Sequence, residues 1–296
     1  MVSKAMNFPV GGEACRDNGL AARFVPEVLR RRTIGVPYEM PASRLPRSAT
    51  TTERPAPSGP PHWSHPGWTE RHPWLIQGIT GRGADEGFDL SPFGVSPAGD
   101  VVRRWAELRR ALGVTGAVHA PQQHGVGIRH HTARRGGLHL VDPCDGHLTR
   151  TPGLLVTVAV ADCVPITLVA PEVRAVAVLH AGWRGVAAGM AGAGLAALAD
   201  RFGVGPAEVE AHLGPAICGT CYEVGPEVHA ALGVDVSDGN RPVDLRGVIT
   251  RDLVAAGLPL DRITTSTWCT RCGDAPFFSH RAGASGRQVS YVAVAP

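Results

Sequence analysis

Three residues whose side chains bind soft or borderline metal ions stand in three separate sequence motifs. His124 lies in QQHG, Cys163 in ADCVP and His180 in HAGWRG. Structural zinc sites are closed by four protein ligands, whereas a site with three protein ligands keeps a position for water or substrate. The set therefore predicts a catalytic zinc site. Copper is a second candidate metal, because it binds the same ligand types more tightly than zinc does.

The expected elements place two of these residues at strand ends. Residues 154–160 form an apolar, valine-rich run with the length of a buried strand, and Cys163 follows it. Residues 175–179 form a second apolar run, which His180 ends, and residues 186–202 are typical of a helix rich in small side chains. A junction between strand and helix directs unpaired backbone N–H groups toward a bound anion.

These three motifs and several others resemble the YfiH family, bacterial proteins also named laccase-domain proteins or multicopper polyphenol oxidases. The resemblance runs from about residue 73 to the C-terminus, and HAGWRG is its most specific part. The further matching segments are GITGR at 78–82, DGHLT at 145–149, GPAI at 214–217, CYEVG at 221–225, CT at 269–270, FFS at 277–279, Arg281 and GR at 286–287.

The resemblance implies an α/β (α+β) fold, a single layered domain of mixed sheets flanked by helices, with zinc on His124, Cys163 and His180. It also implies a zinc-dependent purine nucleoside phosphorylase with adenosine deaminase and methylthioadenosine phosphorylase activity. A bacterial relative is linked to peptidoglycan editing. Two alternatives therefore stay open: a zinc hydrolase that edits peptidoglycan precursors or acts on a related amide, and a non-catalytic metal-binding protein.

Laccase chemistry fits the histidines of the chain less well. Multicopper oxidation needs a site of two histidines and one cysteine plus a trinuclear cluster with many additional histidines. The sequence has no His-x-His pair, and we expect the His130-His131 doublet to lie in a solvated basic loop.

Phosphorolysis requires a pocket for phosphate, which arginine binds through two parallel hydrogen bonds. Arg82, Arg184 and Arg281 stand in family-like motifs and are the candidates. Deamination requires a carboxylate that moves a proton. Asp162 and Glu223 are the candidates for this role, and Asp162 is equally suited to orient a ligand histidine as a hydrogen-bond acceptor.

Two C-x-x-C pairs, Cys218 with Cys221 and Cys269 with Cys272, remain outside this assignment. At a shorter separation they would indicate a structural four-cysteine zinc site, but their separation is long for a zinc ribbon or knuckle. A second metal site and disulfide bonds both stay open. Seven cysteines are an odd number, and together with a thiolate ligand they favour a reducing, cytoplasmic location.

Composition predicts a soluble globular protein. Of 296 residues, 44% are hydrophobic and 19% charged, and no apolar run approaches the twenty residues of a membrane span. The net charge is +3, without a basic helix or an aromatic-interleaved basic patch, so we expect neither nucleic acid nor membrane as a partner. We expect small-molecule substrates, a purine nucleoside and phosphate, and a monomer or weak dimer.

The proline distribution predicts a boundary. Residues 1–72 are rich in proline and arginine and predict a partly disordered N-terminal extension with one short helix at 21–32, while residues 73–296 form the metal-binding catalytic domain. Within the domain, the patterns predict helices at 98–112, 226–232 and 243–256 and strands at 262–268 and 288–294.

Overall fold

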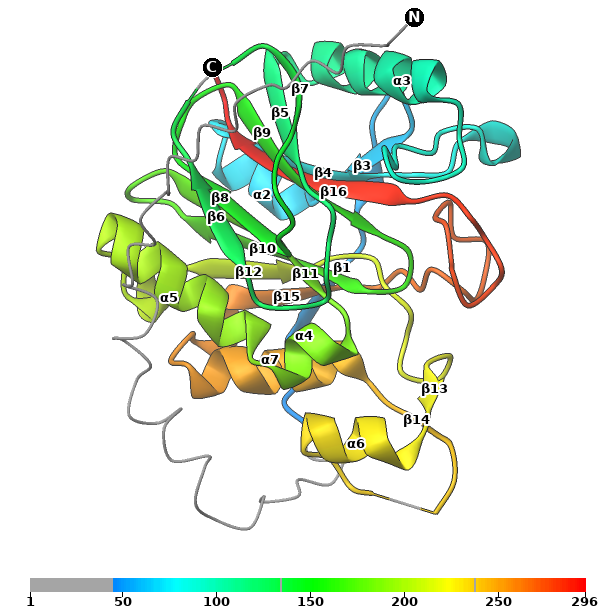
Figure 1. Ribbon diagram of the computed structural model, residues 1–296. Helices are drawn as coiled ribbons and strands as arrows, with labels where there is room; N and C mark the ends of the chain where they lie inside the picture. Colours follow the sequence, from blue (N-terminus) through cyan, green and yellow to red (C-terminus); the bar gives the residue numbers. More distant parts are fainter. Residues whose placement is uncertain (1–44, 134, 237) are drawn as a thin grey trace, which may run out of the picture. The chain divides into compact units, whose positions relative to one another are not determined.

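The computed structural model describes residues 45–133, 135–236 and 238–296. In this part of the chain, two seven-stranded mixed sheets are stacked face to face (Figure 1). Helix α3 covers the outer face of one sheet, and α4, α5 and α7 lie along the outer face of the other. The expected α/β class is therefore confirmed. The elements form four layers, because each of the two sheets has a helical layer on its outer face.

The first sheet carries the strands next to Cys163 and His180. Its strands, in spatial order, are β1 (Ala49–Thr51), β15 (Ile263–Ser266), β12 (Glu210–Leu213), β10 (Val164–Ala170), β11 (Ala175–Ala181), β8 (Gly146–Thr149) and β6 (Ile128–His131). The pairs β1–β15, β15–β12 and β8–β6 are parallel, and the other pairs are antiparallel.

The second sheet contains, in spatial order, β2 (Arg54–Pro55), β3 (His62–Ser64), β4 (Leu75–Thr80), β16 (Gln288–Val294), β9 (Leu154–Val160), β5 (Gly116–His119) and β7 (Gly137–Leu140). A two-stranded ribbon joins β13 (Glu223–Val224) to β14 (Arg241–Pro242). The helices are α2 (Pro66–Arg71), α3 (Ala98–Ala111), α4 (Trp183–Ala187), α5 (Met190–Phe202), α6 (Pro226–Leu232) and α7 (Leu245–Ala255), with 3-10 turns η3 (Ala84–Glu86), η4 (Pro206–Glu208) and η5 (Leu260–Arg262).

The layer between the sheets is filled by β-branched side chains. Val156, Val158 and Val160 of β9 pack in this layer, whereas their neighbour Leu155 packs on the opposite side with Trp105 of α3. Successive side chains of a strand point to opposite faces, and both faces of this strand are covered. The continuous apolar run at 154–160 is therefore a strand buried on both sides.

Residues 49–71 belong to the folded unit, which differs from the boundary at 72 expected from the proline content. Strand β1 pairs with β15 and strand β3 with β4, so the segment extends both sheets. The prolines are compatible because Pro55 lies in the terminal strand of its sheet and Pro66 lies in the first turn of α2, where no N–H partner is required. The helix expected at 21–32 lies outside the described residues.

A buried carboxylate fixes this segment to the first sheet. Glu53 is 3% exposed and accepts hydrogen bonds from His212 Nε2 and from Ser266 Oγ, both at 2.7 Å. Breaking a buried hydrogen-bonded pair of this kind is costly, because the remaining partner is left unsatisfied.

Most of the other expected elements occur at their predicted positions, with two differences. The helix expected over 186–202 is divided into α4 and α5, because Gly189 adopts a left-handed φ of 89° between them. The stretch around His130 and His131 is the edge strand β6 rather than a loop, since it pairs in parallel with β8.

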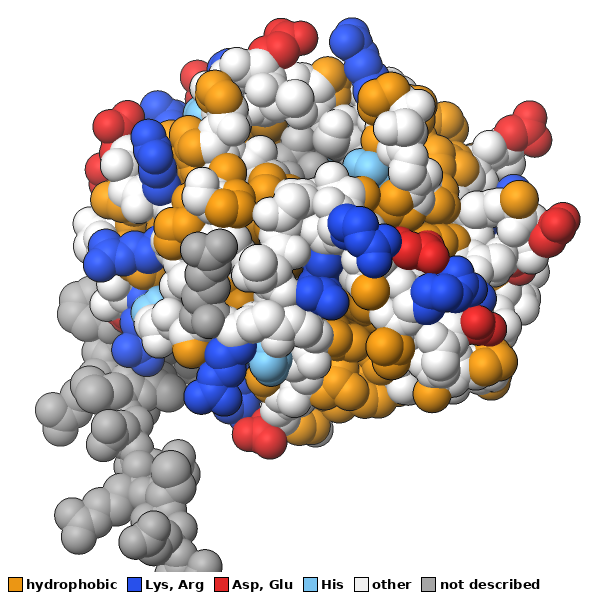
Figure 2. Space-filling view, turned by 90° about the horizontal axis from the view of Figure 1, so that it is seen from above, with side chains coloured by type: hydrophobic (Ala, Val, Ile, Leu, Met, Phe, Trp, Pro, Cys, Tyr) orange, Lys and Arg blue, Asp and Glu red, His pale blue; other side chains and the backbone are white. Residues whose placement is uncertain are grey.

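The face of the molecule drawn in Figure 2 carries side chains of both charges. In the view of Figure 2, basic and acidic side chains adjoin one another, with hydrophobic side chains between them. None of the described helices has the length and apolar character needed to cross a membrane.

Candidate metal centre

The strand register brings Cys163 and His180 together. Strands β10 and β11 are antiparallel neighbours, with Pro165 opposite His180 and Val164 opposite Ala181. Cys163 directly precedes β10, so it lies beside the end of β11 that carries His180. The Cys163 side chain is partly exposed, whereas His180 is buried.

His124 reaches the same place from the loop between β5 and β6. Its backbone is in the left-handed region, with φ of 60°, which is uncommon outside glycine. The carboxylate of Asp145 stabilises this conformation because it accepts hydrogen bonds from three consecutive backbone N–H groups. The donors are Gln123 at 3.2 Å, His124 at 2.8 Å and Gly125 at 2.9 Å.

Asp145 also orients the second histidine. His180 Nδ1 donates to Asp145 Oδ1 at 2.9 Å, and both side chains are almost fully buried. A histidine that donates Nδ1–H to a carboxylate keeps its Nε2 lone pair free for a metal ion. One carboxylate therefore positions the loop of His124 and the ring of His180 together.

The ligand atoms of His124, Cys163 and His180 all lie within 4.8 Å of one another. The two imidazole rings are nearly perpendicular, with centroids 4.7 Å apart. One sulfur and two imidazole nitrogens form a donor set that both zinc and copper accept. His124 is exposed, so the cluster is accessible from solvent.

The local electrostatics favour the ligand form of the cysteine. Burial raises the pKa of Cys163, but hydrogen bonds with His124 and His180 outweigh this effect and lower that pKa to about 6. Burial lowers the pKa of His180, yet Asp145 and Cys163 raise it to about 9. The cluster thus holds a thiolate beside a positive imidazolium, and a bound cation would take the place of the imidazolium proton.

Because Gly182 has no side chain, it leaves room for the side chains of His124 and Cys163. A Cβ atom at this position would lie 2.8 Å from His124 Cδ2 and 3.1 Å from Cys163 Sγ. Any larger residue would therefore displace a ligand. This contact gives a physical reason for the glycine in HAGWRG.

The acceptor of the His180 ring proton is Asp145, whereas Asp162 performs a different task. The Asp162 carboxylate accepts from Thr270 Oγ1 at 2.6 Å and from the backbone N–H of Arg281 at 2.7 Å. Asp162 directly precedes Cys163, so these hydrogen bonds join two loops that are distant in the sequence to the start of the ligand segment. The other proposed proton carrier, Glu223, is exposed in β13, and its backbone oxygen accepts from Arg281 Nη1 at 2.9 Å.

Two of the three candidate arginines act on the electrostatics of Tyr222. The Arg281 guanidinium is 5.3 Å from the centroid of the Tyr222 ring. Burial raises the pKa of Tyr222 to about 12, with a further increase from the negative charge of Cys163, while Arg281 and Arg184 act in the opposite direction. The Arg184 guanidinium itself lies over the ring of Trp183, 4.4 Å from its centroid.

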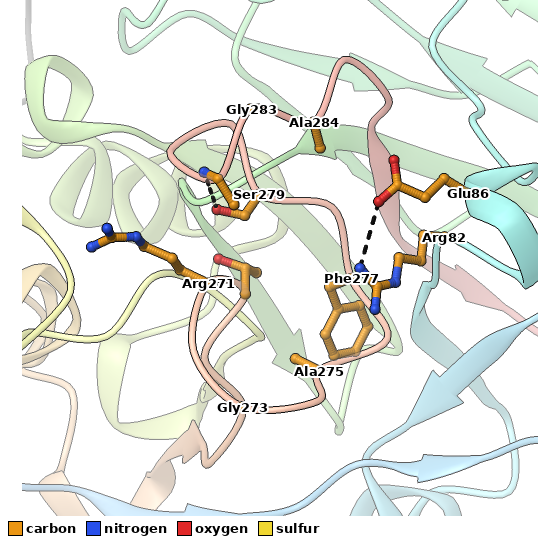
Figure 3. Close-up of a pocket in the computed structure, with 11 residues that line it drawn as sticks. Arg82, Glu86, Arg271, Gly273, Ala275, Phe277, Ser279, Gly283 and Ala284 are labelled. Carbon is orange, nitrogen blue, oxygen red and sulfur yellow. Dashed lines mark hydrogen bonds and ion pairs between the residues drawn. The ribbon is translucent and has the colours of Figure 1, made fainter.

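Arg82, the third candidate arginine, has different neighbours. It forms an ion pair with Glu86 at 3.5 Å and lines a cavity of about 300 Å³ together with Phe277 and Ser279 (Figure 3). Arg271 lines the same cavity, but in Figure 3 its guanidinium points away from Arg82. Ser279 and Ala282, which lie on either side of Arg281 in the sequence, line the same cavity, so the loop that carries Arg281 borders the cavity of Arg82.

A family model described as multi-copper polyphenol oxidoreductase laccase matches residues 87–295. The chain belongs to this family. The resemblance to YfiH proteins is confirmed by a crystal structure of the hypothetical protein YfiH of Bacillus licheniformis. That structure aligns with a TM-score of 0.73 at 27% identity over 82% of this chain and 98% of that chain.

Curated relatives of the chain have enzyme names. Purine nucleoside phosphorylase YlmD of Geobacillus stearothermophilus is 37% identical over 161 residues, which are 50% of this chain and 59% of YlmD. A crystal structure of YlmD aligns with a TM-score of 0.75 at 28% identity, covering 83% of this chain and all (100%) of that chain. Adenosine deaminase RL5 of an unknown prokaryotic organism is 39% identical over 148 residues, 46% of this chain and 56% of that protein. In these sequence alignments, the chain spans between half and two thirds of each relative.

Sequence reasoning did not select Asp145 or Gly182 as site residues. Asp145 was visible as the first residue of the DGHLT segment, but its spacing from the ligands gave no indication of its partners. Its role depends on backbone donors that converge only after β8 and β11 have paired.

Proposed function

We propose that the protein is a zinc-dependent purine nucleoside phosphorylase with adenosine deaminase and methylthioadenosine phosphorylase activity. The observation that carries the proposal is the convergence of His124, Cys163 and His180 on one point, with Asp145 behind them. The names of the relatives YlmD and RL5 supply the reaction classes.

The three residues would hold zinc and leave a position for an exchangeable ligand. Zinc bound in this way acts as a Lewis acid and activates water at neutral pH. Copper is the alternative metal, because the same donors bind it. Among the described residues, the two groups able to hold a metal contain at most two histidines each, fewer than a trinuclear copper cluster uses.

The protein side chains supply positioning. Phosphorolysis forms a bond between a phosphate oxygen and C1′ of the sugar and breaks the bond from C1′ to the purine, which leaves with a proton. We assign the phosphate to Arg184 and Arg281, two exposed arginines whose positive charges both act on Tyr222. Arg82 is not assigned to the phosphate, because its guanidinium forms an ion pair with Glu86.

Asp162 is assigned a positioning role in this proposal. Each of its carboxylate oxygens already accepts a hydrogen bond, and the donors come from the loops of Thr270 and Arg281. The carboxylate therefore aligns Arg281 with the cluster. Glu223, which is exposed, stays the candidate for moving a proton during deamination.

The experiment is turnover of adenosine, inosine and methylthioadenosine by untagged protein, with and without phosphate. We expect release of base that depends on phosphate, and conversion of adenosine to inosine that does not. The variant Cys163→Ala should lose metal and activity together. The matched control is Cys144→Ala, a buried free cysteine outside the cluster, which should keep both.

The same assay separates the alternatives. Hydrolysis of a peptidoglycan precursor or related amide, without phosphate dependence and without nucleoside turnover, would favour the zinc hydrolase. Metal retained on His124, Cys163 and His180 with no turnover of either substrate class would favour a non-catalytic metal-binding protein.

A further inference from the structure

Two parallel strands bring the C-x-x-C pairs together despite their distance in the sequence. Strands β12 and β15 are parallel neighbours, so the loops that follow them begin at the same end of the two strands (Figure 1). The first loop contains Cys218 and Cys221, and the second contains Cys269 and Cys272. The parallel pairing continues beyond the strands as a bridge between Ala216 and Cys269.

The four sulfur atoms have the spacing of a metal site. All four lie within 4.8 Å of one another, and Cys218 Sγ is 3.9 Å from Cys272 Sγ. A tetrahedral zinc site with Zn–S bonds of about 2.3 Å separates its sulfurs by about 3.8 Å. A disulfide bond would instead place two sulfurs about 2 Å apart. All four cysteines are free.

The backbone around the cluster presents donors to sulfur. Cys269 Sγ accepts from three backbone N–H groups, those of Cys218 at 3.3 Å, Arg271 at 3.4 Å and Cys272 at 3.4 Å. Each loop is folded so that its two sulfurs face the same centre. In the first loop a turn bond from Cys221 N–H to Cys218 O, at 3.0 Å, closes the C-x-x-C segment. Hydrogen bonds from backbone N–H groups to sulfur stabilise the negative charge of a metal-bound thiolate.

We propose that Cys218, Cys221, Cys269 and Cys272 together bind one zinc ion in a structural site. Four thiolates close the coordination shell, so this site has no position for substrate. It is separate from the cluster of His124, Cys163 and His180, and it does not depend on the proposed nucleoside activity.

The second site would clamp the loops that hold Asp162. The backbone oxygen of Asp162 accepts from the N–H of Ile217 at 3.1 Å, one residue before Cys218. Its carboxylate accepts from Thr270, one residue after Cys269. The zinc ion therefore joins the two loops outside the sheet, where the strand pairing has ended, and fixes the residue adjacent to Cys163.

The test is the metal content of purified full-length protein, measured by elemental mass spectrometry, in wild type and in variants of each cluster. We expect two zinc ions per chain in wild type, one in Cys272→Ser and one in His124→Ala. The double variant should contain none. Cys272 is exposed, so its replacement should preserve the fold, and Cys218→Ser is a second variant of the same site. Cys144→Ser is the matched cysteine control and should keep both ions.

Cobalt substitution identifies the ligands. Co²⁺ bound by four thiolates gives an intense sulfur-to-metal charge-transfer band, which should remain in His124→Ala and fall in Cys272→Ser to the weaker band of a site with one thiolate, Cys163. Circular dichroism confirms that each variant is folded. One metal per chain in wild type, lost in His124→Ala and unchanged in Cys272→Ser, would overturn the proposal. A disulfide-linked peptide joining any of these four cysteines in the metal-loaded protein would also overturn it.

Discussion

Replacement of Asp145 by Asn tests whether one carboxylate organises the metal centre. The carboxylate accepts from the N–H groups of Gln123, His124 and Gly125 and from the ring of His180. An Asn side chain retains one oxygen, and its amide NH₂ would face backbone donors. With the oxygen kept toward His124 and His180, the bonds from Gln123 and Gly125 are lost.

The cost follows from the number and type of these bonds. A hydrogen bond to a charged group contributes about 1.5–3 kcal/mol, so losing two removes about 3 kcal/mol or more from the loop that carries His124. Loss of the partner that orients a ligand histidine typically weakens metal binding about 10–100-fold. We therefore expect the zinc dissociation constant of Asp145→Asn to increase by about this factor, which is about 1.4–2.7 kcal/mol of binding free energy.

The assay is zinc competition with a chelator of known affinity, followed for the His124, Cys163 and His180 site in the Cys272→Ser background. The matched control is Asp142→Asn, because Asp142 is an aspartate whose side chain is 81% exposed. It should bind zinc as wild type does. A folded Asp145→Asn protein whose dissociation constant stays within about twofold of wild type would refute the role assigned to Asp145.

Three further substitutions test other contacts. Gly182→Ala should weaken zinc binding at least about tenfold, because its Cβ would lie 2.8 Å from a His124 ring carbon. The melting temperature should change little. Gly99→Ala, which has open space around the new Cβ, is the control for both measurements. Burial lowers the pKa of His119 from 6.5 to about 4, so the unfolded chain binds a proton at this residue more tightly than the folded chain does. Protonation of His119 should therefore contribute about 3 kcal/mol to the fall in the free energy of unfolding between pH 7 and pH 4, and chemical unfolding of His119→Gln should show a fall that is smaller by about this amount. Glu53→Gln should destabilise the protein by about 3 kcal/mol, measured by urea unfolding, and an unchanged midpoint would contradict the anchoring of residues 49–71.

Local patterns were sufficient to predict most of the elements. The apolar run at 154–160 coincides with β9, and the amphipathic pattern at 98–112 corresponds to α3, because strand and helix periodicity follow from neighbouring residues alone. Cys163 and His180 were proposed as ligands of one metal from their residue types and motifs, and the structure brings them together through β10, which begins after Cys163 and pairs with β11.

The remaining features depend on contacts between distant residues. The strands before residue 73 were not predicted, because β1 and β3 have three residues each, too short to produce a pattern, and they are stabilised by sheets built from the rest of the chain. The four-cysteine cluster was left open because only the parallel pairing of β12 with β15 brings its halves together. Asp145 was missed because its partners are mostly backbone groups, which have no sequence signature.

The antiparallel pair β10–β11 also has a kinetic consequence. The two strands are joined by a short turn at 171–174, so Cys163 and His180 approach each other through local chain closure, which is fast and entropically inexpensive. His124 joins them through the pairing of β8 with β11, which brings Asp145 to its loop and connects residues farther apart in the sequence. A chain in which only the β10–β11 hairpin has formed would hold two of the three ligands, so full metal affinity requires the longer-range pairing as well. We therefore expect tight retention of the ion to distinguish chains in which both contacts have formed.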